Sequence, residues 1–153
     1  GVVEPEDILL GDFYRSDSYK DMLKKVQGDG LAIKDAPEEM QHDHEIVAEA
    51  CWQNGMALQF VPAEFRGDLE IVACAVHRSP QALMYAAPEL RDDSRIVMKA
   101  VASSGGALEY ASERLRGDRD VVLAAVQNRG IALRYASADL RNDKLVVAAA
   151  LRQ

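Results

Sequence analysis

Five aspartates recur at intervals of 25 residues in this chain of 153 residues, namely Asp43, Asp68, Asp93, Asp118 and Asp143. Each opens the same phrase, which in the fourth copy contains Val121, Val122, Ala125, Val126, Gly130, Ala132, Leu133 and Tyr135. A fixed period of this length is the signature of a stacked-repeat protein. In such a protein each unit packs against its neighbours, because one unit alone cannot bury its apolar side.

Within a unit, the aspartate is a preferred helix N-cap, since its carboxylate accepts hydrogen bonds from the free amides of the first turn. In the second unit, apolar residues then follow at Ile46, Val47, Ala50 and Cys51, which places them on one side of a helix. We therefore interpret Asp43, Asp68, Asp93, Asp118 and Asp143 as structural caps. Each long helix is expected to end near a glycine (Gly55, Gly105 or Gly130) in a left-handed conformation.

A shorter helical segment is predicted after each long helix, for example at residues 107–111. The predicted fold is an all-α solenoid of about five and a half 25-residue repeats, each a long helix plus a short helix. The expected units are 18–42, 43–67, 68–92, 93–117, 118–142 and a partial unit at 143–153, preceded by a short N-terminal cap segment at 1–17. The first unit is degenerate, with Asp21 and Lys25 at positions that are apolar in later copies.

Composition narrows the classes of function. The net charge is -7, and residues 1–42 hold ten acidic and five basic residues. An acidic chain repels phosphate backbones and anionic lipid, so neither nucleic acid nor a membrane is expected as a partner. Two cysteines, no apolar run long enough to span a bilayer and no secretory signal favour a cytoplasmic location. The first residue is Gly1 rather than Met, as expected of a trimmed chain or a fragment.

The repeated phrase resembles the repeat of the DUF4116 family, a domain of unknown function found as tandem helical copies in microbial proteins. The resemblance covers roughly residues 30–151 and is carried in the fourth copy by Leu115, Arg116, Asp118, Val121, Val122, Ala125, Val126, Gly130, Ala132, Leu133, Tyr135, Ala136 and Ser137. It implies a helical fold and no assigned activity. The long-plus-short pattern is also similar, in architecture only, to the leucine-rich variant repeats of the HEAT-like superfamily.

A second column contains Arg66, Arg91, Arg116 and Arg141, each two residues before a capping aspartate. These guanidinium groups form either an inter-repeat fork onto aspartates or helix-end carbonyls, or a stripe that grips nucleic acid or an anionic ligand. The equal spacing favours the structural interpretation.

We expect the residues that recognise a partner to occupy positions at which the repeat units differ from one another. One variable column holds Trp52, His77, Ala102, Gln127 and Arg152, and the next holds Gln53, Arg78, Ser103 and Asn128. Trp52, the sole tryptophan, is expected to be at least partly exposed and suits an interface anchor. The alternative is that it packs on the N-terminal segment, against Leu9 or Phe13.

We therefore expect a non-enzymatic module that binds a protein or peptide, with Trp52, His77, Arg78 and the arginine column as candidate interface residues. No catalytic motif, cofactor motif or zinc-ligand spacing occurs in the chain. An enzyme would instead need a pocket, for example around His42, His44 and Glu45. The apolar residues of the last helix predict that the chain continues there or associates end to end with another copy.

Overall fold

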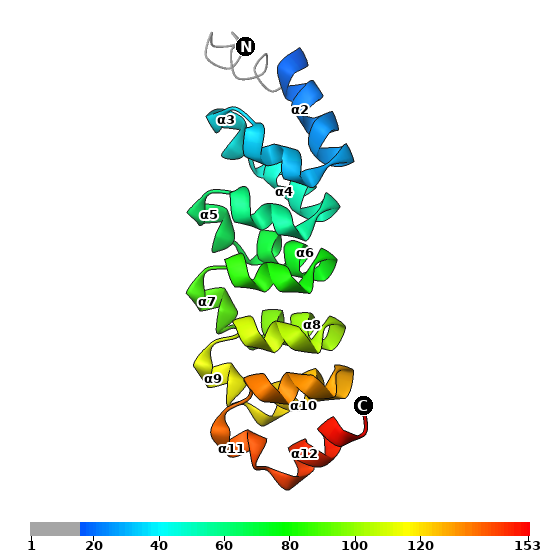
Figure 1. Cartoon of the computed structure of the whole chain (residues 1–153). Helices are drawn as coiled ribbons and strands as arrows, with labels where there is room; N and C mark the ends of the chain where they lie inside the picture. Colours follow the sequence, from blue (N-terminus) through cyan, green and yellow to red (C-terminus); the bar gives the residue numbers. More distant parts are fainter. Residues whose placement is uncertain (1–15) are drawn as a thin grey trace, which may run out of the picture.

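The structure is a computed structural model that describes residues 16–153, and over that range it contains only helices and connecting turns. The helices stack into one elongated array with α2 (Asp17–Gly28) at one end of the stack and α12 (Lys144–Leu151) at the other (Figure 1). The predicted all-α solenoid is thus confirmed. The expected cap segment lies outside the described residues, apart from its last two positions.

The long helices form one layer of the stack. They are α2 (Asp17–Gly28), α4 (His44–Gln53), α6 (Leu69–Arg78), α8 (Ser94–Ser103), α10 (Arg119–Asn128) and α12 (Lys144–Leu151). Each packs on the long helix of the adjacent unit. All five repeating aspartates are N-caps whose side chain accepts a hydrogen bond from a backbone amide two or three residues later.

The expected short helix is two elements rather than one. A six-residue 3₁₀ helix comes first, as η1 (Gly30–Asp35), η2 (Gly55–Phe60), η3 (Pro80–Tyr85), η4 (Gly105–Tyr110) and η5 (Gly130–Tyr135). A single α-helical turn follows, as α3 (Glu38–Gln41), α5 (Ala63–Arg66), α7 (Pro88–Arg91), α9 (Glu113–Arg116) and α11 (Ala138–Arg141). Ser112 and Ser137 cap the turns α9 and α11 with their hydroxyl oxygens, so they begin a new helix.

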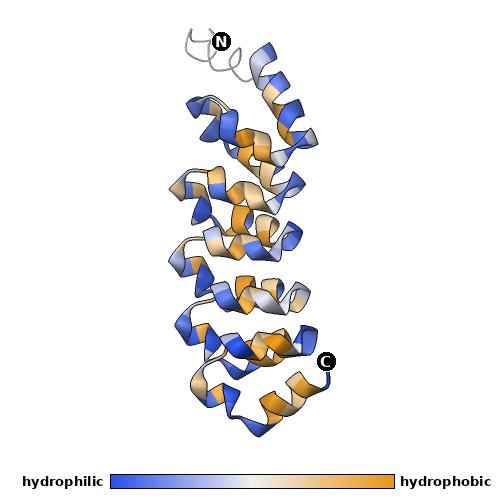
Figure 2. Cartoon of the chain, in the orientation of Figure 1, coloured by the Kyte–Doolittle hydropathy of each residue, from blue (hydrophilic) through white to orange (hydrophobic). Residues whose placement is uncertain are grey.

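The core lies between the layer of long helices and the layer of 3₁₀ helices. Ile46, Val47, Ala50 and Cys51 of α4 are all fully buried, as the helical period predicts. Leu58 of η2 is also fully buried against them. Figure 2 shows apolar residues concentrated in the middle of the helices and hydrophilic residues at the turns along the edges. Burial of this repeated apolar surface is the main force that holds the units together.

The prediction of left-handed glycines at the helix ends is wrong. No glycine in residues 16–153 has a positive φ, and the long helices from α2 to α10 each end at an extended residue such as Asn54. The glycine instead begins the 3₁₀ helix and lies against the next unit. A Cβ at Gly55 would lie 2.0 Å from the carbonyl oxygen of Ala75, and one at Gly130 would lie 2.2 Å from that of Ala150. Glycine is therefore needed for close approach between units, not for its conformational freedom.

Pro80 is the exception at this position. It opens η3, so the junction between α6 and α8 accommodates a Cβ that the glycine junctions exclude. Proline also has no backbone N–H, which matters for the hydrogen bonds between units described below.

Backbone hydrogen bonds also join successive units. The carbonyl oxygens of Arg66, Arg91 and Arg116 accept from the amides of Ala87, Ser112 and Ser137 in the following unit, at 2.8–2.9 Å. These bonds satisfy helix-end carbonyls, which would otherwise have no partner within their own helix. These hydrogen bonds therefore connect each one-turn helix to the start of the one-turn helix in the next unit.

The last helix buries less of its apolar side than the others. Leu151 of α12 is 80% exposed, whereas Val126 and Val101, at the same position of earlier units, are fully buried. Leu145 is also exposed. The end of the array formed by α12 is therefore apolar and open within the described residues.

Candidate interaction surface

The structure brings Trp52, His77 and Arg78 together on the surface of the long-helix layer. Trp52 lies near the end of α4 and the other two lie at the end of α6, one unit further on. The rings of Trp52 and His77 are stacked, with centroids 6.4 Å apart and planes 15° apart. The guanidinium carbon of Arg78 lies 5.4 Å from the centroid of the Trp52 ring, within the range of a cation–π interaction.

This cluster remains open to solvent. Trp52 is 55% exposed, in line with the expectation of partial exposure, and His77 and Arg78 are exposed as well. The alternative packing partners Leu9 and Phe13 lie outside the described residues. A tryptophan that contacts two side chains of the next unit and is still half exposed has a large area available for contact.

Cys74 lies one turn before Arg78 on α6 and is partly exposed. Burial raises the pKa of its thiol, and Arg78 acts in the opposite direction by favouring the thiolate. Cys51, on α4, is fully buried, and burial raises its pKa to about 12. Neither thiol therefore has the lowered pKa of a reactive cysteine.

The arginine column lies at the junctions between units, on the other edge of the stack. The Nε of Arg91 donates to the carbonyl oxygen of Tyr110, the last residue of the 3₁₀ helix in the next unit, at 2.7 Å. This is one hydrogen bond between units to a helix-end carbonyl. Gln41, at the same position of the first unit, donates to the carbonyls of Ile33 and Lys34.

The other arginines of the column differ from Arg91. The Nε atoms of Arg66 and Arg116 are buried without a hydrogen-bond partner, and Arg141 is exposed. Arg66 and Arg116 each line a cavity of about 250 Å³, beside Tyr85 and Tyr135 respectively. Each of these two cavities is therefore lined in part by an arginine of the column.

The second variable column has a role that the sequence analysis missed. The side-chain oxygen of Asn128 accepts from the amide of Gly105 at 2.7 Å, and its nitrogen donates to the carbonyl of Ala102 at 3.1 Å. Gln53 makes the same pair of bonds, to the amide of Gly30 at 2.6 Å and the carbonyl of Gly28 at 3.2 Å. Both amides therefore clamp a unit to the one before it.

A signal for this clamp was present in the sequence. An amide side chain occurs 23 residues after Gly30 (Gln53) and 23 residues after Gly105 (Asn128). The residue 23 positions after Pro80 is Ser103, and Pro80 has no backbone N–H that such a side chain could accept. Arg78, at the same position after Gly55, has donors only and cannot accept from that amide. Arg78 therefore does not make the pair of bonds that Gln53 and Asn128 make, and its guanidinium group lies over the Trp52 ring.

The residues named for a catalytic pocket do not converge. His42 Nδ1 lies 2.8 Å from Glu64 Oε1 on the next unit, and the ring of His44 lies 6.1 Å from that of Phe65. Glu45 accepts a hydrogen bond from the Tyr19 hydroxyl at 2.8 Å. Each of the three is therefore directed at a different partner.

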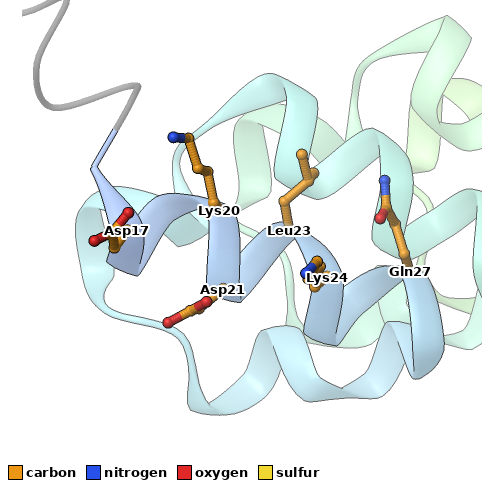
Figure 3. Close-up of a pocket in the computed structure, with 6 residues that line it drawn as sticks. All are labelled: Asp17, Lys20, Asp21, Leu23, Lys24 and Gln27. Atoms are coloured by element: carbon orange, nitrogen blue, oxygen red, sulfur yellow. The ribbon is translucent and has the colours of Figure 1, made fainter.

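An open hollow of about 590 Å³ lies along α2. It is lined by Asp17, Lys20, Asp21, Leu23, Lys24 and Gln27. Figure 3 shows these side chains pointing away from one helix in different directions rather than toward a common point. His42, His44 and Glu45 do not line it.

Residues 16–153 contain no group of three or more His, Cys, Asp or Glu side chains placed to hold a metal ion. In the same range, no helix is both long enough and apolar enough to cross a membrane.

Comparison with known proteins identifies the repeat. The family model described as a domain of unknown function (DUF4116) matches five times in tandem, at residues 21–66, 53–91, 68–116, 93–141 and 118–153. Neither the curated proteins nor the solved structures include a match to the chain. Because the five overlapping matches together cover residues 21–153, which is more than half of the chain, the chain belongs to the DUF4116 family.

Proposed function

We propose that this chain is a non-enzymatic helical-repeat module that binds a protein or peptide through the surface around Trp52. The observation that supports the proposal is the cluster of Trp52, His77 and Arg78, in which two adjacent units contribute to one exposed group. Tryptophan and arginine are the residue types most enriched among energetic hot spots of protein interfaces. The repeat core is the same in every unit, so the surface that varies is the place for specificity.

The experiment uses the sole tryptophan as its reporter. A displayed library of random peptides is selected against the chain, and binding of each enriched peptide is measured by the fluorescence of Trp52. Since loss of a hot-spot side chain costs about 2 kcal/mol or more, Trp52→Ala should weaken binding by roughly thirtyfold, measured with labelled peptide.

Met84→Ala is the matched control, because Met84 is an exposed apolar residue of η3 and not of the long-helix layer. It should leave the affinity within about twofold of the parent. Equal binding to the Trp52→Ala variant, or no enriched peptide at all, would refute the proposed site.

A second candidate is the binding of a small anion by the arginine column. It is favoured by the buried, unpartnered Nε atoms of Arg66 and Arg116 beside their cavities. Calorimetric titration with inorganic phosphate tests it. Heat of binding that disappears in Arg66→Gln and Arg116→Gln, and persists in Arg91→Gln, would favour this function over peptide binding.

A further inference from the structure

An apolar stripe runs along the exposed side of the long-helix layer. We call it the outer stripe, and it consists of Leu23, Ala48, Ala73, Met98, Leu123 and Ala148. Its residues occupy one position of each long helix. Leu23, Ala48, Ala73 and Leu123 are partly buried and pack against the core, whereas Met98 is 37% exposed. The position is apolar in all six units.

A second feature lies one helical turn from the outer stripe. We call it the C-terminal rim, which is formed by the ends of the long helices at residues 52–54, 77–79, 102–104, 127–129 and 152–153. The rim contains His77, Arg78, Arg129 and Arg152, all exposed, and no aspartate or glutamate; the corresponding end of α2, which lies outside the rim, carries the exposed Asp29. It is thus a positively charged edge on a chain whose net charge is -7.

The spacing of the stripe selects the shape of a partner. Packed helices lie about 8–10 Å apart, so the stripe offers one apolar contact at about that interval. Seven residues of an α-helix rise about 10.5 Å, so a helix laid along the stack meets each unit once per heptad. An extended peptide also repeats at about 10 Å every three residues, but its backbone would need hydrogen-bond partners.

An extended backbone would have to find those partners among exposed side chains of the rim, such as Gln127 and Ser103. The long helices satisfy their own backbone groups, and the amides of Gln53 and Asn128, which could hold an extended backbone, are engaged between units. A partner helix needs none, because its backbone is internally bonded. Because the rim is positively charged, we expect the side of the partner helix that faces Arg78, Arg129 and Arg152 to be acidic.

We infer that the partner of this module is an amphipathic α-helix with an acidic flank, lying lengthwise on the outer stripe with its acidic side toward the C-terminal rim. This inference rests on the proposed function, since it names the class of peptide that the surface around Trp52 receives. Trp52 lies where the stripe and the rim meet, one turn after Ala48 on α4, and so anchors the apolar face of the partner.

The test selects from a displayed library of amphipathic helices of about four heptads in which the flanking charges are randomised, with the random-peptide library in parallel. We expect the enriched helices to carry acidic residues on one flank. Their affinity should fall at least roughly tenfold in Arg78→Gln/Arg129→Gln/Arg152→Gln, and with rising salt, because rim charges act through screened attraction.

The matched control is Lys34→Gln/Arg114→Gln/Arg134→Gln, which removes three exposed charges from the 3₁₀ and one-turn helices. It should bind like the parent. Enrichment of basic helices or of unstructured peptides that still need Trp52 would overturn this inference and leave the proposed function standing. Equal losses in both triple variants would overturn it too, and failure of both libraries would refute the proposed function itself.

Discussion

Replacing Gly55 by alanine should destabilise the stack, whereas the same change at Gly106 should not. Both glycines lie in 3₁₀ helices and neither has a positive φ, so alanine suits the backbone of each. Their surroundings differ. A Cβ at Gly55 would lie 2.0 Å from the Ala75 oxygen and 2.9 Å from the Cβ of Ser79, while one at Gly106 has no atom within 4 Å.

The expected magnitude follows from that contact. A carbon and a carbonyl oxygen approach to about 3.3 Å at closest, so α6 must move away from η2 by roughly 1 Å. Overpacking of this kind costs about 1–3 kcal/mol. Gly→Ala itself stabilises by about 0.4–1 kcal/mol through the unfolded chain, and this gain applies to both variants. The overpacking cost alone should separate their midpoints by roughly 2–12 °C.

Thermal unfolding followed by far-UV circular dichroism measures this difference. Gly130→Ala should fall between the two, since its contact, Ala150, belongs to α12, which has no further unit on its outer side within the described residues. If Gly55→Ala melted at or above Gly106→Ala, α6 would be free to shift at no cost, and close approach would not explain the glycines.

Four further outcomes are expected. Asn128→Ala leaves the buried amide of Gly105 without its acceptor and should cost about 1–3 kcal/mol in chemical denaturation, while the exposed neighbour Gln127→Ala should stay within about 0.5 kcal/mol of the parent. Arg91→Ala removes the bond to Tyr110 and should lower the melting temperature by several degrees without changing the affinity for peptide. The control Arg141→Ala, at an exposed arginine of the same column, should leave the melting temperature unchanged. An unchanged melting temperature in Arg91→Ala would argue against the structural role. Because burial raises the pKa of Cys51 to about 12, stability should be intact below about pH 8.5, where an unfolded thiol is still protonated, and should decline as pH rises toward 12; a thiol reagent should label Cys74 first, and equal labelling rates in the folded chain would contradict this burial. We also propose that the chain associates through the open face of α12, so that Leu151→Lys should reduce the mass measured by light scattering at high concentration; identical masses for parent and variant would exclude that contact.

The two layers of helices were predictable because their signals are local. The aspartate caps bond within their own first turn, and the buried positions such as Ile46 and Val47 follow the helical period, so both are visible in one unit. The exposure of Trp52 and the burial of Cys51 follow from the same period. Repetition strengthened each signal by showing it several times.

What the sequence by itself determined is therefore the all-helical repeat, its period and the side that each long helix buries, since these depend on residues a few positions apart. Only the tertiary structure decided that Gly55 makes room for the carbonyl of Ala75, that Asn128 clamps Gly105, and that Arg78 lies over Trp52. Each of these contacts joins residues about 20–26 positions apart, whose meeting depends on the distance and offset between stacked units. That offset is set by the packing of the whole core, which no single unit contains.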